Sequence, residues 1–252
     1  MAMVSAGAII PFVVLAALLL AALHVLAVVL PVQTPDALAI EVRGQQWWWE
    51  FEYGGETGTV RTANELHIPT GRRVVLRLRA HDVIHSLWVP ALQGKLDLIP
   101  GKTNVTWLQA DHPGVYRSQC AEFCGMQHAQ MAFLVIAQPP AEFDAWLLAQ
   151  RQPAVSPADE QARRGERLFV DRGCASCHTI RGSLAFFGGF GPDLTHVASR
   201  RTLAAGVLEN SKGALAGWIA NPQTLKPGSR MPHTPLAADD FHAIVHYVSA
   251  LR

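Results

Sequence analysis

The sequence predicts a chain in three parts: a single membrane-spanning helix, an all-β sandwich and a small all-α domain. An uncharged apolar run occupies residues 8–30. Short β-branched segments separated by Gly and Pro turns follow, and the last part of the chain has apolar residues at helical spacing. We place the anchor at 1–35, the β domain at 36–138, a helix with a linker at 139–157 and the helical domain at 158–252.

The composition excludes two broad classes of protein. Half of the 252 residues are hydrophobic and only 16% are charged, which excludes a disordered chain. The 21 Lys and Arg residues nearly balance the 20 Asp and Glu residues, so the formal net charge is +1. Nucleic-acid binding relies on a strongly basic surface, and this balance therefore argues against that function.

The apolar run from Ala8 to Leu30 is long enough to cross a membrane. A helix of this length spans roughly 34 Å, and the hydrocarbon core of a bilayer is about 30 Å thick. A cleaved signal peptide is the alternative, but it needs a basic segment before the apolar core. No Lys or Arg precedes this run, and it ends at Leu30-Pro31. We therefore predict a retained anchor.

The β domain is indicated by short segments rich in β-branched and aromatic residues. Turns rich in Gly and Pro separate these segments, and several short strands at such spacing are typical of a sandwich or barrel. The predicted strands are 38–42, 74–79, 104–108 and 132–136, and the predicted turns are 53–55, 69–71, 99–101 and 112–114.

Helices are predicted on both sides of a linker at residues 151–157. The helix after the linker is expected to begin with Ser156 as its N-cap, because Pro157 suits the first helical position and Asp159 suits a capping box. The last helix is predicted at about residues 238–250, where apolar residues recur at helical spacing.

The helical domain contains a C-x-x-C-H motif, formed by Cys174, Cys177 and His178. Two thiols at this spacing can form thioethers to a haem, and the adjacent imidazole can then ligate the iron. A redox-active dithiol and half of a zinc site are the alternatives. Met231 is the only methionine after His178, and a thioether is a suitable second axial ligand. The motif therefore predicts one covalently bound haem c, with Met231 as its second ligand.

A second cluster of metal-binding residues lies within twelve positions of the β domain. It comprises Cys120, Cys124, His128 and Met131, and soft sulfur with imidazole selects copper or zinc. A blue-copper centre uses only one Cys, whereas a zinc site has no use for Met131. Two thiolates that bridge two copper ions use every residue of the cluster, and each metal then needs one imidazole.

The second imidazole has to come from elsewhere in the chain. His81 and His85 both precede the cysteines, and spacing alone leaves both of them open as the ligand.

The chain from the anchor to about Ile136 resembles subunit II of haem–copper cytochrome c oxidases. The resemblance rests on the loop 120–131, the segments 82–90 and 94–101 and the cluster 44–49. It implies a cupredoxin sandwich that holds the dinuclear copper centre CuA. The ligands it implies are His85, Cys120, Cys124, His128, Met131 and the main-chain carbonyl of Glu122.

The same resemblance implies two further roles. The Glu122 side chain belongs to a magnesium site shared with subunit I, and Trp47 is the residue at which electrons reach CuA. The Trp47-Trp48-Trp49 triplet also suits an interfacial aromatic belt or the sandwich core, and these readings stay open. The chain departs from the family pattern in one respect, because most subunit II chains have two transmembrane helices and this one has room for one.

The last 95 residues are similar to class I c-type cytochromes. This resemblance implies that His178 and Met231 ligate the haem iron and that the Pro192 carbonyl orients His178. A CuA domain fused to a cytochrome c domain resembles the caa-type oxidases.

The resemblance to caa-type oxidases implies a function for the whole chain. We expect the subunit to lie in the bacterial inner membrane with both metal domains on the periplasmic face. It would take electrons from a donor such as cytochrome c and deliver them to subunit I. The CuA subunit of a nitric oxide reductase and a free-standing membrane-anchored electron carrier remain as alternatives.

Overall fold

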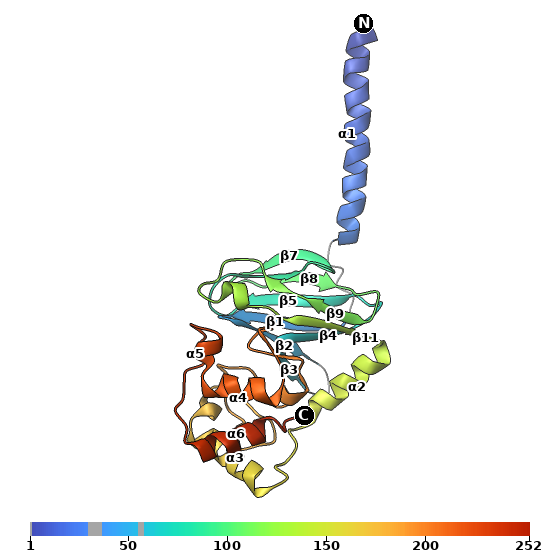
Figure 1. Ribbon diagram of the computed structural model, residues 1–252. Coiled ribbons are helices and arrows are strands. Elements are labelled where there is room, and N and C mark those ends of the chain that lie inside the picture. The colour runs from blue at the N-terminus through green and yellow to red at the C-terminus, as the bar shows by residue number, and fades with distance from the viewer. Residues whose placement is uncertain (1, 30–36, 55–57) are drawn as a thin grey trace. The chain divides into compact units, whose positions relative to one another are not determined.

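The structure is a computed structural model that describes residues 2–29, 37–54 and 58–252 (Figure 1). These residues fall into two units, which divide between Asp36 and Ala37. The predicted end of the anchor at Leu30-Pro31 and Gly55 of the predicted turn 53–55 lie outside the described residues.

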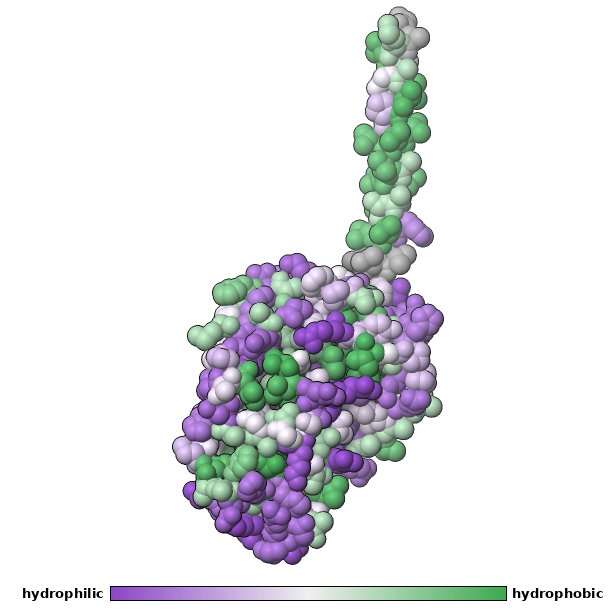
Figure 2. Space-filling model, in the orientation of Figure 1, coloured by the Kyte–Doolittle hydropathy of each residue, from purple (hydrophilic) through white to green (hydrophobic). Residues whose placement is uncertain are grey.

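The first unit is a single helix, α1, at Ala2–Val29. It begins six residues before the predicted start, since nothing between Ala2 and Gly7 stops a helix. Its described side chains carry no charge, and Figure 2 shows apolar residues along its visible face. The segment Met3–Ala27 is long and apolar enough to cross a membrane, and it is the only such helix in the described parts of the chain. A helix that is apolar all round suits a lipid environment.

The β domain is a sandwich whose larger sheet has five strands in the order β3-β2-β1-β5-β8. β1 pairs antiparallel with β2 and parallel with β5. Along β2, buried and partly exposed residues alternate, as they do in a strand with one face on a core. The strands are β1 Ala39–Gln45, β2 Trp48–Tyr53, β3 Val60–Ala63, β5 Val74–Ala80 and β8 Asn104–Leu108.

Two three-stranded sheets complete the sandwich, in the orders β4-β11-β9 and β10-β6-β7. The core between the sheets contains Trp49, Phe51 and Phe133, whose rings meet edge to face at 5.3 and 5.0 Å. The expected all-β sandwich is therefore confirmed. Its remaining strands are β4 Glu65–Pro69, β6 His85–Val89, β7 Gln93–Leu98, β9 Gly114–Arg117, β10 Gln119–Cys120 and β11 Leu134–Gln138.

The helix α2, at Pro140–Arg151, packs on the β domain. Trp146 on this helix stacks on the ring of His67 with centroids 3.9 Å apart. Beyond it, Asp159 and not Ser156 caps the next helix, because the Asp159 carboxylate accepts a hydrogen bond from the Ala162 amide at 2.7 Å. The predicted cap was therefore wrong, since residues 154–158 stay outside the helix.

The last domain is mainly helical, as expected. α3 crosses α6, and Asp240 on α6 joins the two helices through ion pairs with Arg164 and Arg172. One pair of two-residue strands, β12 Thr202–Leu203 and β13 Leu208–Glu209, departs from the all-α expectation. The helices are α3 Glu160–Asp171, α4 Lys212–Ala220, α5 Pro222–Leu225 and α6 Ala238–Val248.

The crossing of α3 and α6 depends on Gly165. A Cβ atom at this position would lie 2.2 Å from the Ala243 carbonyl oxygen, which belongs to the α6 backbone. We expect Gly165→Ala to lower the free energy of unfolding by about 1–3 kcal/mol, since one helix must move away from the other. Denaturant unfolding of the full chain, followed by the near-ultraviolet signal, measures this loss.

The matched control is Gly213→Ala on α4. A Cβ atom there would have no neighbour within 4 Å, and alanine in a helix is favoured over glycine by about 0.5–1 kcal/mol. We expect this variant to be as stable as the parent protein or slightly more stable. Equal behaviour of the two variants would contradict the close helix crossing.

Candidate metal and haem sites

The sulfur-rich loop of the β domain lies between β10 and β11. Its two ends are held together by a hydrogen bond from the Cys120 amide to the Met131 carbonyl at 2.9 Å. The Ala121 amide also donates to the Ser86 carbonyl of β6 at 3.0 Å. These backbone bonds fix the start of the loop against the strand that begins at His85.

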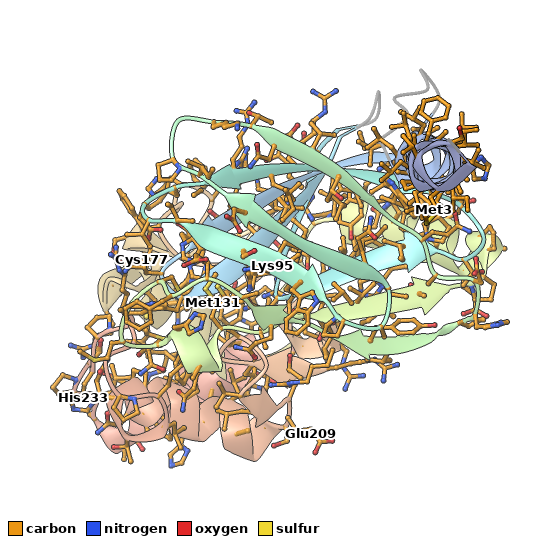
Figure 3. The ribbon with its side chains drawn as sticks, turned by 90° about the horizontal axis from the view of Figure 1, so that it is seen from above. Met3, Lys95, Met131, Cys177, Glu209 and His233 are labelled. Atoms are coloured by element: carbon orange, nitrogen blue, oxygen red, sulfur yellow. The ribbon has the colours of Figure 1, made fainter. Side chains whose placement is uncertain are left out.

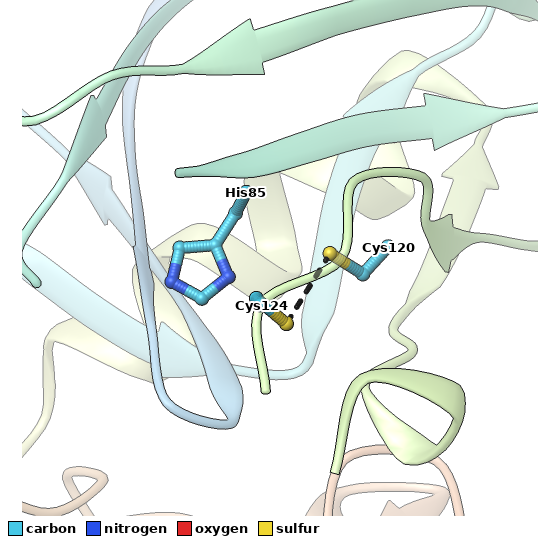
Figure 4. A group of neighbouring side chains, drawn as sticks. All are labelled: His85, Cys120 and Cys124. Carbon is cyan, nitrogen blue, oxygen red and sulfur yellow. Dashed lines mark hydrogen bonds between the residues drawn. The ribbon is translucent and has the colours of Figure 1, made fainter. Parts of the chain in front are cut away.

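The loop brings three sulfur atoms together. The Cys120 and Cys124 sulfurs are 3.8 Å apart (Figure 4). The Cys124 sulfur is also 3.8 Å from the Met131 sulfur. The His128 Nδ1 atom lies 3.7 Å from the Cys124 sulfur, and the Glu122 carbonyl oxygen lies 3.4 Å from the Cys120 sulfur. All the loop residues expected to hold copper are therefore gathered at one place.

The structure brings His85, and not His81, to the cysteines. His85 is fully buried, and one of its ring nitrogens lies within 4.8 Å of both cysteine sulfurs. Its Nε2 atom is 2.9 Å from an Asp82 carboxylate oxygen, whereas its buried Nδ1 atom has no hydrogen-bond partner among the described residues. His81, by contrast, is exposed. A buried nitrogen left unpaired beside two thiols is the arrangement of a metal ligand, and Asp82 fixes the ring orientation.

The two thiols do not share the same proton affinity. The hydrogen bond from the Cys124 thiol holds the pKa of Cys120 well below its usual value. The pKa of Cys124 is raised in turn, because it is hydrogen-bonded to the Cys120 thiolate and is buried. One thiolate is thus favoured even before a metal binds, and thiolate is the form that binds metals. The donor set and the unpaired His85 nitrogen therefore fit copper.

The residues of the C-x-x-C-H motif line a cavity of about 550 Å³ in the last domain. Cys174, Cys177 and His178 line this cavity from the segment after α3. Met231 joins them from the segment before α6. Cys177 and Met131, both labelled in Figure 3, mark this cavity and the sulfur-rich loop. Both thiols are free and partly buried, so they are available to form thioethers.

The His178 ring is held in one orientation. Its Nδ1 atom is 2.8 Å from the Pro192 carbonyl oxygen, which leaves Nε2 for a ligand bond. Desolvation in the cavity lowers the pKa of His178, so the neutral imidazole that ligates iron is favoured. A Cβ atom on Gly191 would lie 2.7 Å from this ring, and one on Gly188 would lie 2.5 Å from the His178 backbone. Glycine is therefore needed at both positions for the loop to pass so close to His178. The oriented imidazole and the two free thiols that line the cavity fit a haem.

The three tryptophans have different surroundings. Trp49 is fully buried in the sandwich core, whereas Trp47 and Trp48 are half-buried and line the haem cavity. The Trp47 indole nitrogen also donates to the Cys124 carbonyl oxygen at 2.9 Å. Trp47 therefore contacts the sulfur-rich loop through its indole ring and also lines the haem cavity.

Several residues at the contact between the sulfur-rich loop and the haem cavity were not predicted from the sequence. The Gln46 side chain donates to the Cys124 carbonyl at 2.9 Å, and Lys226 donates to the Trp47 carbonyl at 3.2 Å. These partners are 78 and 179 residues apart in the chain, so no local pattern connects them. Asp82 had a detectable signal, since a carboxylate three residues before a histidine often supports it.

Two family models match the chain, one in each domain. Residues 54–138 match the family described as "Cytochrome C oxidase subunit II, periplasmic domain", and residues 162–252 match the family "Cytochrome c". These matches cover the sulfur-rich loop and the C-x-x-C-H motif respectively.

Curated relatives extend the similarity across both domains. The chain is 39% identical to "Cytochrome c oxidase subunit 2" of Alkalihalophilus pseudofirmus over 86% of its own length and 62% of that protein. It is 34% identical to the protein of the same name from Bacillus subtilis, over 86% of this chain and 63% of that one. The chain thus spans slightly less than two thirds of the length of these relatives.

A solved structure is also similar. The crystal structure of the periplasmic domain of subunit II of cytochrome oxidase of Bradyrhizobium japonicum is 30% identical, with a TM-score of 0.44. The similarity covers 47% of this chain and 97% of that structure.

Proposed function

Because the chain belongs to the cytochrome c oxidase subunit II family and carries a cytochrome c domain after its cupredoxin-like domain, we propose that it is the electron-accepting subunit of a membrane-bound terminal oxidase. The cytochrome c domain takes electrons from an external donor such as a cytochrome c. It passes them to the copper domain, which delivers them to the oxygen-reducing subunit I.

The geometry of the two sites supports a set of residues for each cofactor. His85, Cys120, Cys124, His128, Met131 and the Glu122 carbonyl hold the dinuclear CuA centre in this proposal, and Cys174, Cys177, His178 and Met231 hold one haem c. Bound copper and haem iron both supply reversible one-electron transfer. The protein residues bind these groups, orient them and exclude water from them.

The contact between the two sites is the observation that carries the proposal. Trp47 lines the haem cavity and its indole nitrogen binds the Cys124 carbonyl at 2.9 Å, so a single residue bridges the two centres. We propose that Trp47 is the residue through which electrons reach the copper domain from the haem domain of the same chain.

The remaining parts of the proposal concern the partner and the membrane. α1 anchors the chain in the bacterial inner membrane, with both metal domains on the periplasmic face. The half-buried Glu122 side chain belongs to a magnesium site shared with subunit I. The anchor keeps the copper domain close to that partner.

Metal analysis of the purified full-length chain tests the proposal. We expect two copper atoms and one covalent haem per chain, and we expect a large polytopic subunit with haem and copper to purify with it. The double variant Cys174→Ser with Cys177→Ser is the matched control, since it removes the haem attachment and should retain both coppers. Zinc in place of copper, or a chain that purifies without any partner, would contradict the proposed function.

A further inference from the structure

A buried lysine, Lys226, lies where the two domains meet. Only 3% of its surface is exposed. Its ammonium group donates to the Trp47 carbonyl at 3.2 Å and to the Ala204 carbonyl at 3.1 Å. These two carbonyls belong to different domains, so Lys226 connects the copper domain to the cytochrome c domain.

The positive charge of Lys226 has no ion-pair partner in the described parts of the chain, where only a charge on the Cys124 sulfur favours the ammonium form. No carboxylate there lies within ion-pair distance, and both of its hydrogen-bond partners are neutral carbonyls. An ammonium group has three N–H donors, so one donor is left without a partner in these contacts. Burial lowers the pKa of Lys226 to about 8, which reflects the cost of an unpaired buried charge.

The same lysine lines the haem cavity together with three arginines, and these have other partners. Arg172 forms an ion pair with Asp240 at 2.6 Å. Arg230 donates to the Gln46 side chain, and Arg200 donates to the Asp193 carbonyl while the charges of Asp193 and Glu65 offset its own. Arg230 is exposed, so water solvates its charge, and Lys226 is therefore the buried cation of the cavity that has no carboxylate beside it.

A haem brings the missing negative charge to this cavity. Haem c carries two carboxylate groups on its propionate side chains. We propose that Lys226 binds one haem carboxylate with its third N–H group, and that it thereby fixes the haem against the Trp47 peptide. The proposal rests on the haem attachment in the proposed function, and it assigns the haem a carboxylate-binding residue from the domain junction.

This contact also sets the orientation of the haem relative to the copper domain. A haem carboxylate held by Lys226 is linked to the Trp47 carbonyl by two hydrogen bonds of the same ammonium group, and the indole of Trp47 contacts Cys124. Lys226 is thus a positioning residue for electron transfer between the domains, and it adds a positive charge beside the haem.

The test uses the full-length, haem-loaded chain and its haem reduction potential. Lys226→Gln keeps an N–H donor for the carbonyls but removes the charge, and Lys226→Arg keeps the charge. Lys212→Gln is the matched control, because Lys212 is exposed at the start of α4. We expect Lys226→Gln to lower the haem potential, since a nearby positive charge favours the reduced haem. Lys226→Arg should largely retain the potential, and Lys212→Gln should leave it unchanged.

A second measurement keeps the test sharp if the glutamine variant does not take up haem. Infrared difference spectra of chains carrying ¹³C-labelled haem carboxylates should show a shifted carboxylate band in Lys226→Arg relative to the parent chain. A carboxylate band in Lys226→Arg that matches the Lys212→Gln control, or a haem potential in Lys226→Gln that matches it, would overturn the proposal. A chain without any covalent haem would instead contradict the proposed function.

Discussion

Replacing Cys120 with serine is expected to abolish the mixed-valence copper signal of the chain while haem c stays attached and reducible. The Cys120 and Cys124 sulfurs lie 3.8 Å apart, which is the arrangement needed for two thiolates to bridge two metals. A serine hydroxyl is a hard oxygen that stays protonated near neutral pH, so it is a poor ligand for copper. Under the proposed function, electron delivery by the assembled oxidase should stop for the same reason, because the haem domain would then have no acceptor.

Electron paramagnetic resonance, copper analysis and oxygen consumption by the assembled complex measure this effect. Ala129→Ser is the matched control, since it adds a hydroxyl to an exposed position of the same loop. Met131→Leu should give an intermediate result, because a weak thioether ligand is lost while both thiolates remain. Oxygen consumption at the parent rate in Cys120→Ser would contradict the assignment of the site.

The parts of the fold that sequence patterns predict are those with a local physical cause. The charge-free run of α1, the β-branched segment 74–79 and the apolar spacing of α6 each reflect the surroundings of one element. Candidate residues for the two cofactor sites could be proposed from the sequence as well, since soft ligands in a short loop and the C-x-x-C-H spacing are local. The choice of Asp159 over Ser156 as a helix cap could not, because the linker is held by a hydrogen bond from Ala154 to the Arg181 carbonyl.

The contacts between the two sites could not be predicted from the sequence either, because they have no local cause. The contacts of Lys226 with Trp47, of Arg230 with Gln46 and of Glu65 with the Arg201 amide join residues that are 136 to 184 positions apart. Such contacts follow from the packing of one folded domain on another. The sequence also did not indicate why residues 188 and 191 are glycines. The structure shows that they let the loop pass close to His178.

If both domains carry electrons, as proposed, the domain junction explains why they are combined in one chain. The Glu65 carboxylate accepts hydrogen bonds from the Arg201 and Thr202 amides at 2.5 and 3.1 Å, and the Ala132 amide donates to the Ala205 carbonyl at 3.1 Å. These contacts hold the haem cavity beside the copper loop without a diffusional encounter. Transfer between the domains should therefore depend little on salt, in contrast to the docking of a separate donor.

Replacing Met231 with alanine is expected to leave the haem covalently attached but to change its iron coordination and lower its potential. In the proposed function Cys174 and Cys177 form the attachment, and neither depends on the thioether. Met231 lines the same cavity as His178 and is the only methionine after it in the chain. Axial-ligand identity moves haem potentials over about 0.8 V, and a thioether raises the potential. We therefore expect a fall on the order of 0.1 V or more, with a high-spin or misligated spectrum.

Optical spectra and redox titration of the full-length chain measure this change. Met126→Ala is the matched control, because it is the same substitution at a side chain that is 77% exposed and lies in the other domain. Met231→His separates coordination from packing, since an imidazole should restore a low-spin haem at a potential below that of the parent chain. A parent-like spectrum and potential in Met231→Ala would remove this residue as the ligand, because no other described methionine lines the cavity.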